Sequence, residues 1–120
     1  MMAKTPMAAV NAHMEAINAK RSDRMAETVW FPFLHMQPDG AKTWFESSAD
    51  MPDTSTPPFS RSEIQSLEIL ATSGELILYS LTFQRYDDRD EPLLRVQGLW
   101  GVHRVADEWK VGWRQYLGEV

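Results

Sequence analysis

The chain has 120 residues and no cysteine, its formal net charge is −5, and its hydrophobic and charged fractions are 43% and 24%. These values fit one folded globular domain over residues 1–120, exclude disulfides, thiol nucleophiles and cysteine zinc sites, and argue against a nucleic-acid partner, which requires basic residues. No apolar run approaches the roughly 20 residues of a membrane helix and the first residues lack the apolar core of a signal peptide, so we expect a cytoplasmic protein with no membrane partner.

The first third of the chain predicts two helices that meet at a tight corner. Thr5 can cap a helix whose first residue is Pro6, because that position needs no backbone donor. A stripe at helical spacing follows and contains Met7, Val10, Met14 and Ile17. Ser22 and Asp23 then fit the start of a second, shorter helix.

The period changes from that of a helix to that of a strand at Trp30. An edge hairpin is predicted, with strands at 31–36 and 42–45 and a turn that contains Pro38 and Gly40. Residues 46–51 fit one or two helical turns. Residues 52–60 hold three prolines and read as a loop with a single apolar anchor, Phe59.

The second half of the chain predicts long strands only. They cover residues 63–72, 75–86, 93–105 and 109–117. Helices followed by consecutive antiparallel strands indicate an α+β fold, with the N-terminal helices packed on a strongly curved, mixed but mostly antiparallel sheet.

The apolar pattern of the last two strands predicts their register, because a shift of one residue moves every side chain to the other face. If Asp107 and Glu108 form the loop, the apolar face holds Val96, Trp100, Val102, Trp109, Val111 and Trp113. The polar face then holds Arg95, Gln97, His103, Lys110, Arg114 and Tyr116. For the hairpin before it, the same reasoning places Tyr79 opposite Gly98, where a large ring meets a position without a side chain.

Four stretches of the chain resemble the nuclear-transport-factor-two-like superfamily, which includes ketosteroid isomerases and SnoaL-like domains. They are residues 10–26, 33–45, 81–86 and 109–113. The resemblance implies a cystatin-like cone with a pocket between the helices and the concave sheet. It also implies a homodimer through the outer face of the sheet, where Arg95, His103, Arg114 and Tyr116 would lie.

Enzymes of the ketosteroid-isomerase type use an Asp base on the first strand. This chain has no carboxylate there, and His35 is the titratable side chain in its place. We therefore name His35 as the candidate acid or base and Tyr79 as the candidate hydrogen-bond donor. His13 is expected to contact a helix or lie at the surface.

A mostly apolar pocket is expected from the abundance of aromatic and methionine residues. Its candidate lining residues are Trp30, Phe33, Trp44, Phe45, Phe59, Leu81, Phe83, Trp100 and Trp113, with residues 52–60 as a lid. The three histidines lack metal-ligand spacing, and no nucleotide-binding motif occurs, so neither a metal nor a cofactor is expected.

Three functions are consistent with the sequence. The first is a protein that binds a small apolar molecule without catalysis. The second is an isomerase, dehydratase or cyclase that uses His35 and Tyr79. The third is a homodimerisation module whose cone is filled by side chains.

Overall fold

Two helices open the chain in the computed structural model, which describes residues 3–51 and 61–120. Helix α1 spans Pro6–Ala19, and the Thr5 hydroxyl oxygen caps it by accepting a hydrogen bond from the Ala8 amide at 3.1 Å. The helix ends at Lys20 in the left-handed conformation, with φ at 59°. Helix α2 follows at Ser22–Ala26. The predicted pair of helices and the Thr5 cap are confirmed.

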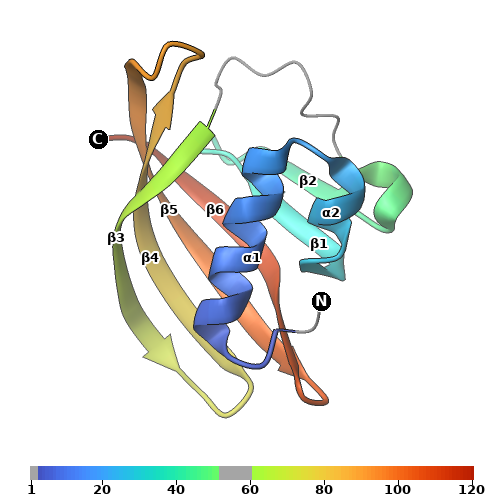
Figure 1. The fold of residues 1–120 in the computed structure, drawn as a ribbon. Helices are drawn as coiled ribbons and strands as arrows, with labels where there is room; N and C mark the ends of the chain where they lie inside the picture. The colour runs from blue at the N-terminus through green and yellow to red at the C-terminus, as the bar shows by residue number, and fades with distance from the viewer. Residues whose placement is uncertain (1–2, 52–60) are drawn as a thin grey trace.

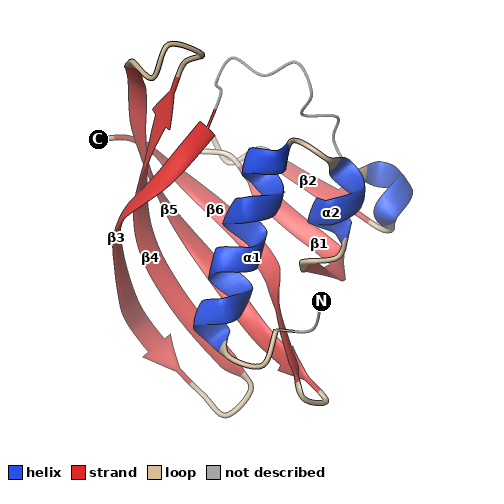
Figure 2. Cartoon of the chain, in the orientation of Figure 1, coloured by secondary structure: helices blue, strands red, loops and turns tan. Residues whose placement is uncertain are grey.

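Six strands form one sheet in the order β2-β1-β6-β5-β4-β3 (Figure 2). Their bounds are β1 Val29–Met36, β2 Lys42–Phe45, β3 Arg61–Thr72, β4 Leu76–Tyr86, β5 Pro92–Val105 and β6 Glu108–Glu119. A short 3-10 helix, η1, lies at Ser48–Asp50. Only the β1–β6 pairing among these strands is parallel. The predicted mixed, mostly antiparallel α+β architecture is confirmed.

The sheet curves around α1, and Figure 1 shows the helix lying across its concave side. We call the side that faces α1 the inner face and the opposite side the outer face. Helix α1 packs on β6, β3 and β5. The largest fully buried side chains lie between helix and sheet and include Trp100, Phe33, Phe83, Leu81 and His13.

The hairpin of β4 and β5 has the predicted faces but not the predicted partners. Tyr79 lies opposite Trp100, and Leu81 rather than Tyr79 lies opposite Gly98. The error is two residues, which is one full period of a strand, so every side chain keeps its face. Tyr79, Leu81 and Phe83 are buried on the inner face.

The hairpin of β5 and β6 differs from its prediction in a way that changes faces. Its loop is Ala106 and Asp107, not Asp107 and Glu108, and Ala106 adopts a φ of 56°. The register then shifts: Val111 pairs with Val102, whereas Trp113 pairs with Gly101. Strand β6 therefore contains one extra residue, Gly112, which is a β-bulge.

This bulge reverses the orientation of residues 113–116, up to a second register shift between Tyr116 and Gly118. Trp113, predicted on the inner face, lies on the outer face, and Arg114 and Tyr116, predicted on the outer face, lie on the inner face. Gly101 makes the arrangement possible because the Trp113 ring occupies the space that a Cβ at this position would need. At Gly112 an added Cβ would lie 2.6 Å from the His103 ring.

Among the described residues, no helix has the length and apolar character needed to cross a membrane.

Candidate functional site

A line of polar and aromatic side chains crosses the middle of the inner face. The register places His35 beside Arg114, Arg114 beside Trp100, and Trp100 beside Tyr79. We call His35, Arg114 and Trp100 the inner row. Helix α1 contributes His13, whose ring lies 5.0 Å from that of Trp100 in an edge-to-face contact.

His13 holds Arg114 through a chain of hydrogen bonds with a defined direction. The Thr28 hydroxyl donates its proton to the Met25 carbonyl at 2.8 Å, so its oxygen must accept from His13 Nδ1 at 2.7 Å. His13 Nε2 is then free to accept from Arg114 Nη1 at 3.1 Å. Burial, and then the charge of Arg114, hold the pKa of His13 well below its ordinary value, which agrees with a neutral ring.

His35 is also a neutral histidine with a defined tautomer. Its Nε2 lies 3.0 Å from Gln37 Nε2, and because an amide nitrogen can only donate, His35 Nε2 accepts. The proton of the neutral ring is therefore on Nδ1. Burial, reinforced by the positive charges of Arg114 and Arg85, lowers the pKa of His35 to about 4. The ring stands edge-on to Tyr116, with 4.6 Å between centroids.

Each member of the inner row has a buried nitrogen without a hydrogen-bond partner among the described residues. The three atoms are His35 Nδ1, Arg114 Nε and Trp100 Nε1. With the tautomer above, all three are donors, so the groups that would satisfy them are acceptors. Buried polar groups are nearly always hydrogen-bonded, and unpaired ones need a specific explanation.

The predicted pocket residues divide between the two faces of the sheet. Those on the inner face are Phe33, Phe45, Leu81, Phe83 and Trp100, all buried. Those on the outer face are Trp30, Trp44 and Trp113, so their prediction as lining of the inner pocket is wrong. Phe59 lies outside the described residues, as does the predicted lid.

The structure does not bring His35 and Tyr79 together. They lie on β1 and β4, with β6 and β5 between them, so about 14 Å separates their backbones at the usual strand spacing. The predicted pairing of these two residues as acid or base and donor is therefore wrong. Tyr116 is the tyrosine beside His35. Strand alternation alone predicts Tyr116 on the outer face, because alternation does not reveal the bulge at Gly112.

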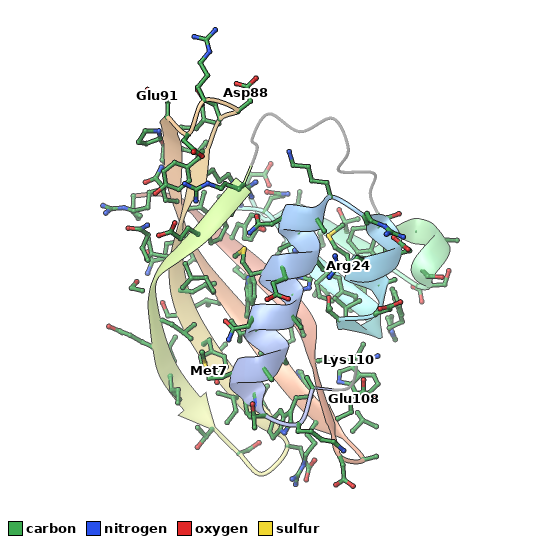
Figure 3. All side chains as sticks on the ribbon, viewed as in Figure 1. Met7, Arg24, Asp88, Glu91, Glu108 and Lys110 are labelled. Atoms are coloured by element: carbon green, nitrogen blue, oxygen red, sulfur yellow. The ribbon has the colours of Figure 1, made fainter. Side chains whose placement is uncertain are left out.

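The outer face carries an open groove of about 520 Å³. Its lining is Trp30, Pro32, Leu34, Met36, Trp44, His103, Val105, Gly112 and Trp113. Trp30 is fixed by a hydrogen bond from its indole nitrogen to the His103 carbonyl at 3.0 Å, and the Lys110 ammonium lies 4.7 Å from its ring. Lys110 pairs with Glu108 at 3.5 Å, and Figure 3 shows both side chains together. The groove is apolar and faces away from α1.

No group of three His, Cys, Asp or Glu side chains in residues 3–51 and 61–120 is placed to hold a metal ion. The inner row together with His13 offers donors and two neutral histidine rings. Its chemistry is therefore that of hydrogen bonding and charge, and it contains no carboxylate that could act as a general base.

Comparison with known proteins gives a result for structure but not for sequence. No protein-family model matches the chain, and no curated protein sequence matches it. Solved structures do. A candidate calcium/calmodulin-dependent protein kinase type II association domain from Thiobacillus denitrificans is 16% identical, with a TM-score of 0.78 over 97% of this chain and 96% of that one.

Two further matches have the same architecture. An NTF2-like protein from Cytophaga hutchinsonii is 11% identical, with a TM-score of 0.72 over 92% of each chain. A candidate ketosteroid isomerase from Parabacteroides distasonis is 14% identical, with a TM-score of 0.69 over 97% of this chain and 92% of that one. The matches cover more than nine-tenths of each chain at 16% identity or less and carry different descriptions, so the likeness is one of fold. The chain has the NTF2-like, cystatin-like fold, as its sequence predicts.

Proposed function

We propose that the protein binds a small molecule between α1 and the inner face of the sheet, at the inner row. The observation that carries the proposal is the set of three buried donors without partners: His35 Nδ1, Arg114 Nε and Trp100 Nε1. They belong to neighbouring positions on three adjacent strands. A bound molecule with acceptor atoms would satisfy them.

The energetic argument is that unpaired buried donors are costly. Each costs about 1–3 kcal/mol relative to a hydrogen-bonded group, and a protein of this size has a total stability of only about 5–15 kcal/mol. Three such groups in one row are therefore a large fraction of that stability. Several buried donors without partners are expected in a protein where a bound ligand supplies the missing acceptors.

Aromatic rings surround the polar atoms and would contact the rest of the molecule. Arg114 lies 5.1 Å from the Phe33 ring and 5.7 Å from the Tyr116 ring, measured from its guanidinium carbon. Phe83 packs on Tyr116 with 5.8 Å between centroids. The ligand we propose therefore has an apolar body, as the sequence suggested, and a polar end with acceptor atoms.

The proposal predicts that the purified protein retains or captures such a molecule. Native mass spectrometry should show added mass on the chain, and a panel of small acceptor-bearing compounds should include members that raise the melting temperature. Trp100→Phe removes one donor from the inner row and should weaken binding several-fold. Trp44→Phe, the same change on the outer face, should leave binding unchanged. Equal binding by the two variants, or no binding by either, would contradict the proposal.

The apolar groove on the outer face of the sheet supports a second candidate function, self-association. Trp44 at its rim is 55% exposed, and none of the helices that the structure describes covers this face (Figure 1). Contiguous exposed apolar surface usually marks an interaction site. We propose that a second copy of the chain covers the groove and that the protein is a homodimer.

Charge favours a second copy over other partners. Two chains of net charge −5 repel each other unless they meet where acidic groups are absent. Strands β1, β4 and β5 contain no Asp or Glu, and in β6 the only ones are Glu108 and Glu119 at its two ends. The face built from these strands is therefore the one on which like copies can approach without repulsion.

The dimer is tested by mass in solution. Light scattering on a gel-filtration peak should give twice 13.8 kDa, and Trp44→Glu should shift the protein toward the monomer because it places a charge in the apolar contact. Ile69→Glu is the matched control, since Ile69 is 60% exposed on β3, away from the groove. A monomeric wild type, or equal effects of the two variants, would exclude this interface.

A further inference from the structure

We propose that the molecule bound at the inner row is a small organic acid and that Arg114 holds its carboxylate. This inference rests on the proposed ligand site and specifies that the ligand carries a negative charge. The observation behind it is a buried positive charge that has no negative partner among residues 3–51 and 61–120.

The environment of Arg114 differs from that of the arginines that form ion pairs. Arg21, Arg61 and Arg104 each contact a carboxylate at 2.7–3.1 Å, and their side chains are 39–63% exposed. Arg114 is only 7% exposed, yet none of the ion pairs among the described residues includes it. A buried charge is normally tolerated only when it is paired.

Within residues 3–51 and 61–120, no acidic side chain pairs with Arg114. Strands β1, β4 and β5 contain no acidic residue. On β3, Glu63 and Glu68 lie opposite Gln84 and Ser80, not opposite the inner-face residues of β4, and Glu15 on α1 is exposed. The acidic cluster of the β4–β5 connection, which includes Asp88 and Glu91, points away from the helix at the far tip of the hairpin (Figure 3). In the part of the chain that the structure describes, Arg114 therefore has no negative partner, and the proposed ligand would supply one.

A second cation strengthens the preference for an anion. Arg85 on β4 is half-buried, it is hydrogen-bonded to Tyr116, and the positive charge of Arg114 contributes to lowering its pKa, after burial. The two guanidinium groups therefore repel each other across this part of the inner face. A bound anion would convert that repulsion into attraction for both groups.

The donors fit a carboxylate better than a phosphate. A carboxylate has two oxygens with about four acceptor sites, and it can accept from two nitrogens of one guanidinium in parallel. It would also leave acceptor capacity for His35 Nδ1 and Trp100 Nε1. A phosphate is a more strongly hydrated dianion, and the rings of Phe33, Phe83 and Tyr116 would not replace its water.

The test compares an acid with its uncharged amide. Binding of benzoate, benzamide and inorganic phosphate to the full chain is measured by titration calorimetry and by the shift in melting temperature. Benzoate should bind at least about tenfold more tightly than benzamide, because charge-assisted hydrogen bonds to a buried guanidinium are lost with the amide. Phosphate should give no comparable shift.

Variants then separate a ligand-binding arginine from a structural one. Arg114→Met should abolish the benzoate shift and, at the same time, raise the melting temperature of the unliganded protein, because it removes an uncompensated buried charge. Arg114→Lys keeps the charge but loses Nε and should weaken benzoate about tenfold; it serves if the methionine variant does not fold. Arg24→Met, on the exposed face of α2, should change neither quantity.

The outcomes distinguish this inference from the ligand site on which it rests. If benzamide binds as tightly as benzoate and Arg114→Met still binds both compounds, the proposed ligand site remains supported. The inference that its ligand is an organic acid held by Arg114 is then wrong. Binding of phosphate in preference to benzoate would also overturn the carboxylate. If no compound binds and native mass spectrometry finds no retained molecule, both proposals are wrong.

Discussion

The orientation of Arg114 depends on one neutral imidazole from α1. The Met25 carbonyl fixes the Thr28 hydroxyl, which fixes the His13 tautomer, which in turn presents an acceptor to Arg114. Protonation of His13 would remove that acceptor and place two positive charges 3.1 Å apart. His13 is therefore a positioning residue. The expected surface or helix-contact position does not describe it, because its ring is fully buried and contacts Trp100 and Arg114 of the sheet.

Stability should fall as the pH is lowered from 7.5 to 5.5. The folded-state pKa of His35 is about 4, and that of His13 is also lowered, whereas unfolded histidines titrate near 6.5. The unfolded state thus binds more protons in this range. The stability that these residues contribute is fully present above pH 6.5 and is lost as the pH falls toward 4. The charged and polar groups that face them are Arg114, Arg85, Thr28, Gln37 and Tyr116.

Urea unfolding at three pH values measures this effect. Each neutral histidine adds a slope of at most about 1.4 kcal/mol per pH unit. His35→Gln should therefore flatten the dependence relative to the wild type. A slope that is unchanged in this variant would show that His35 is protonated equally in both states.

At the scale of elements, the bulge at Gly112 determines which side chains form the site. Without it, Arg114 and Tyr116 would face outward and Trp113 would enter the core. The bulge places Trp113 over Gly101, where no side chain competes for the space. Gly112 and Gly101 therefore act together: Gly112 is the extra residue of the bulge, and Gly101 leaves the space that the Trp113 ring occupies.

Gly101→Ala should destabilise the protein by about 1–3 kcal/mol, because the new methyl group collides with the Trp113 indole. The double variant Gly101→Ala with Trp113→Leu should recover part of that loss, since the two positions are coupled. Gly74→Ala is the matched control, because an added Cβ there meets nothing within 4 Å. Equal unfolding free energies for Gly101→Ala and Gly74→Ala would show that the ring does not lie over Gly101.

The elements themselves could be predicted from the sequence, because their signals are local. The Thr5 cap, the helical stripe and the alternation of the strands all identify their elements within a few residues. The faces of β6 after Val111 could not be predicted by alternation, because a bulge adds a residue without changing composition. Gly112 in mid-strand was the available signal, and reading it as a bulge would have placed Arg114 inside.

At the scale of the whole molecule, charge is distributed unevenly between surface and interior. The chain is acidic overall, yet its inner face presents cations and neutral donors, and the groove on its outer face is apolar. The fold is shared with solved proteins of several descriptions, so it does not specify the ligand. The specificity we infer comes from side chains that this chain places on the common sheet, with Arg114 as the central one.

A crystal structure of the protein grown with benzoate tests this account most directly. We expect a carboxylate oxygen within hydrogen-bond distance of Arg114 Nε, with the benzoate ring against Phe33 or Phe83. An inner row that holds only water in the presence of saturating benzoate, or an Arg114 side chain on the outer face, would contradict it.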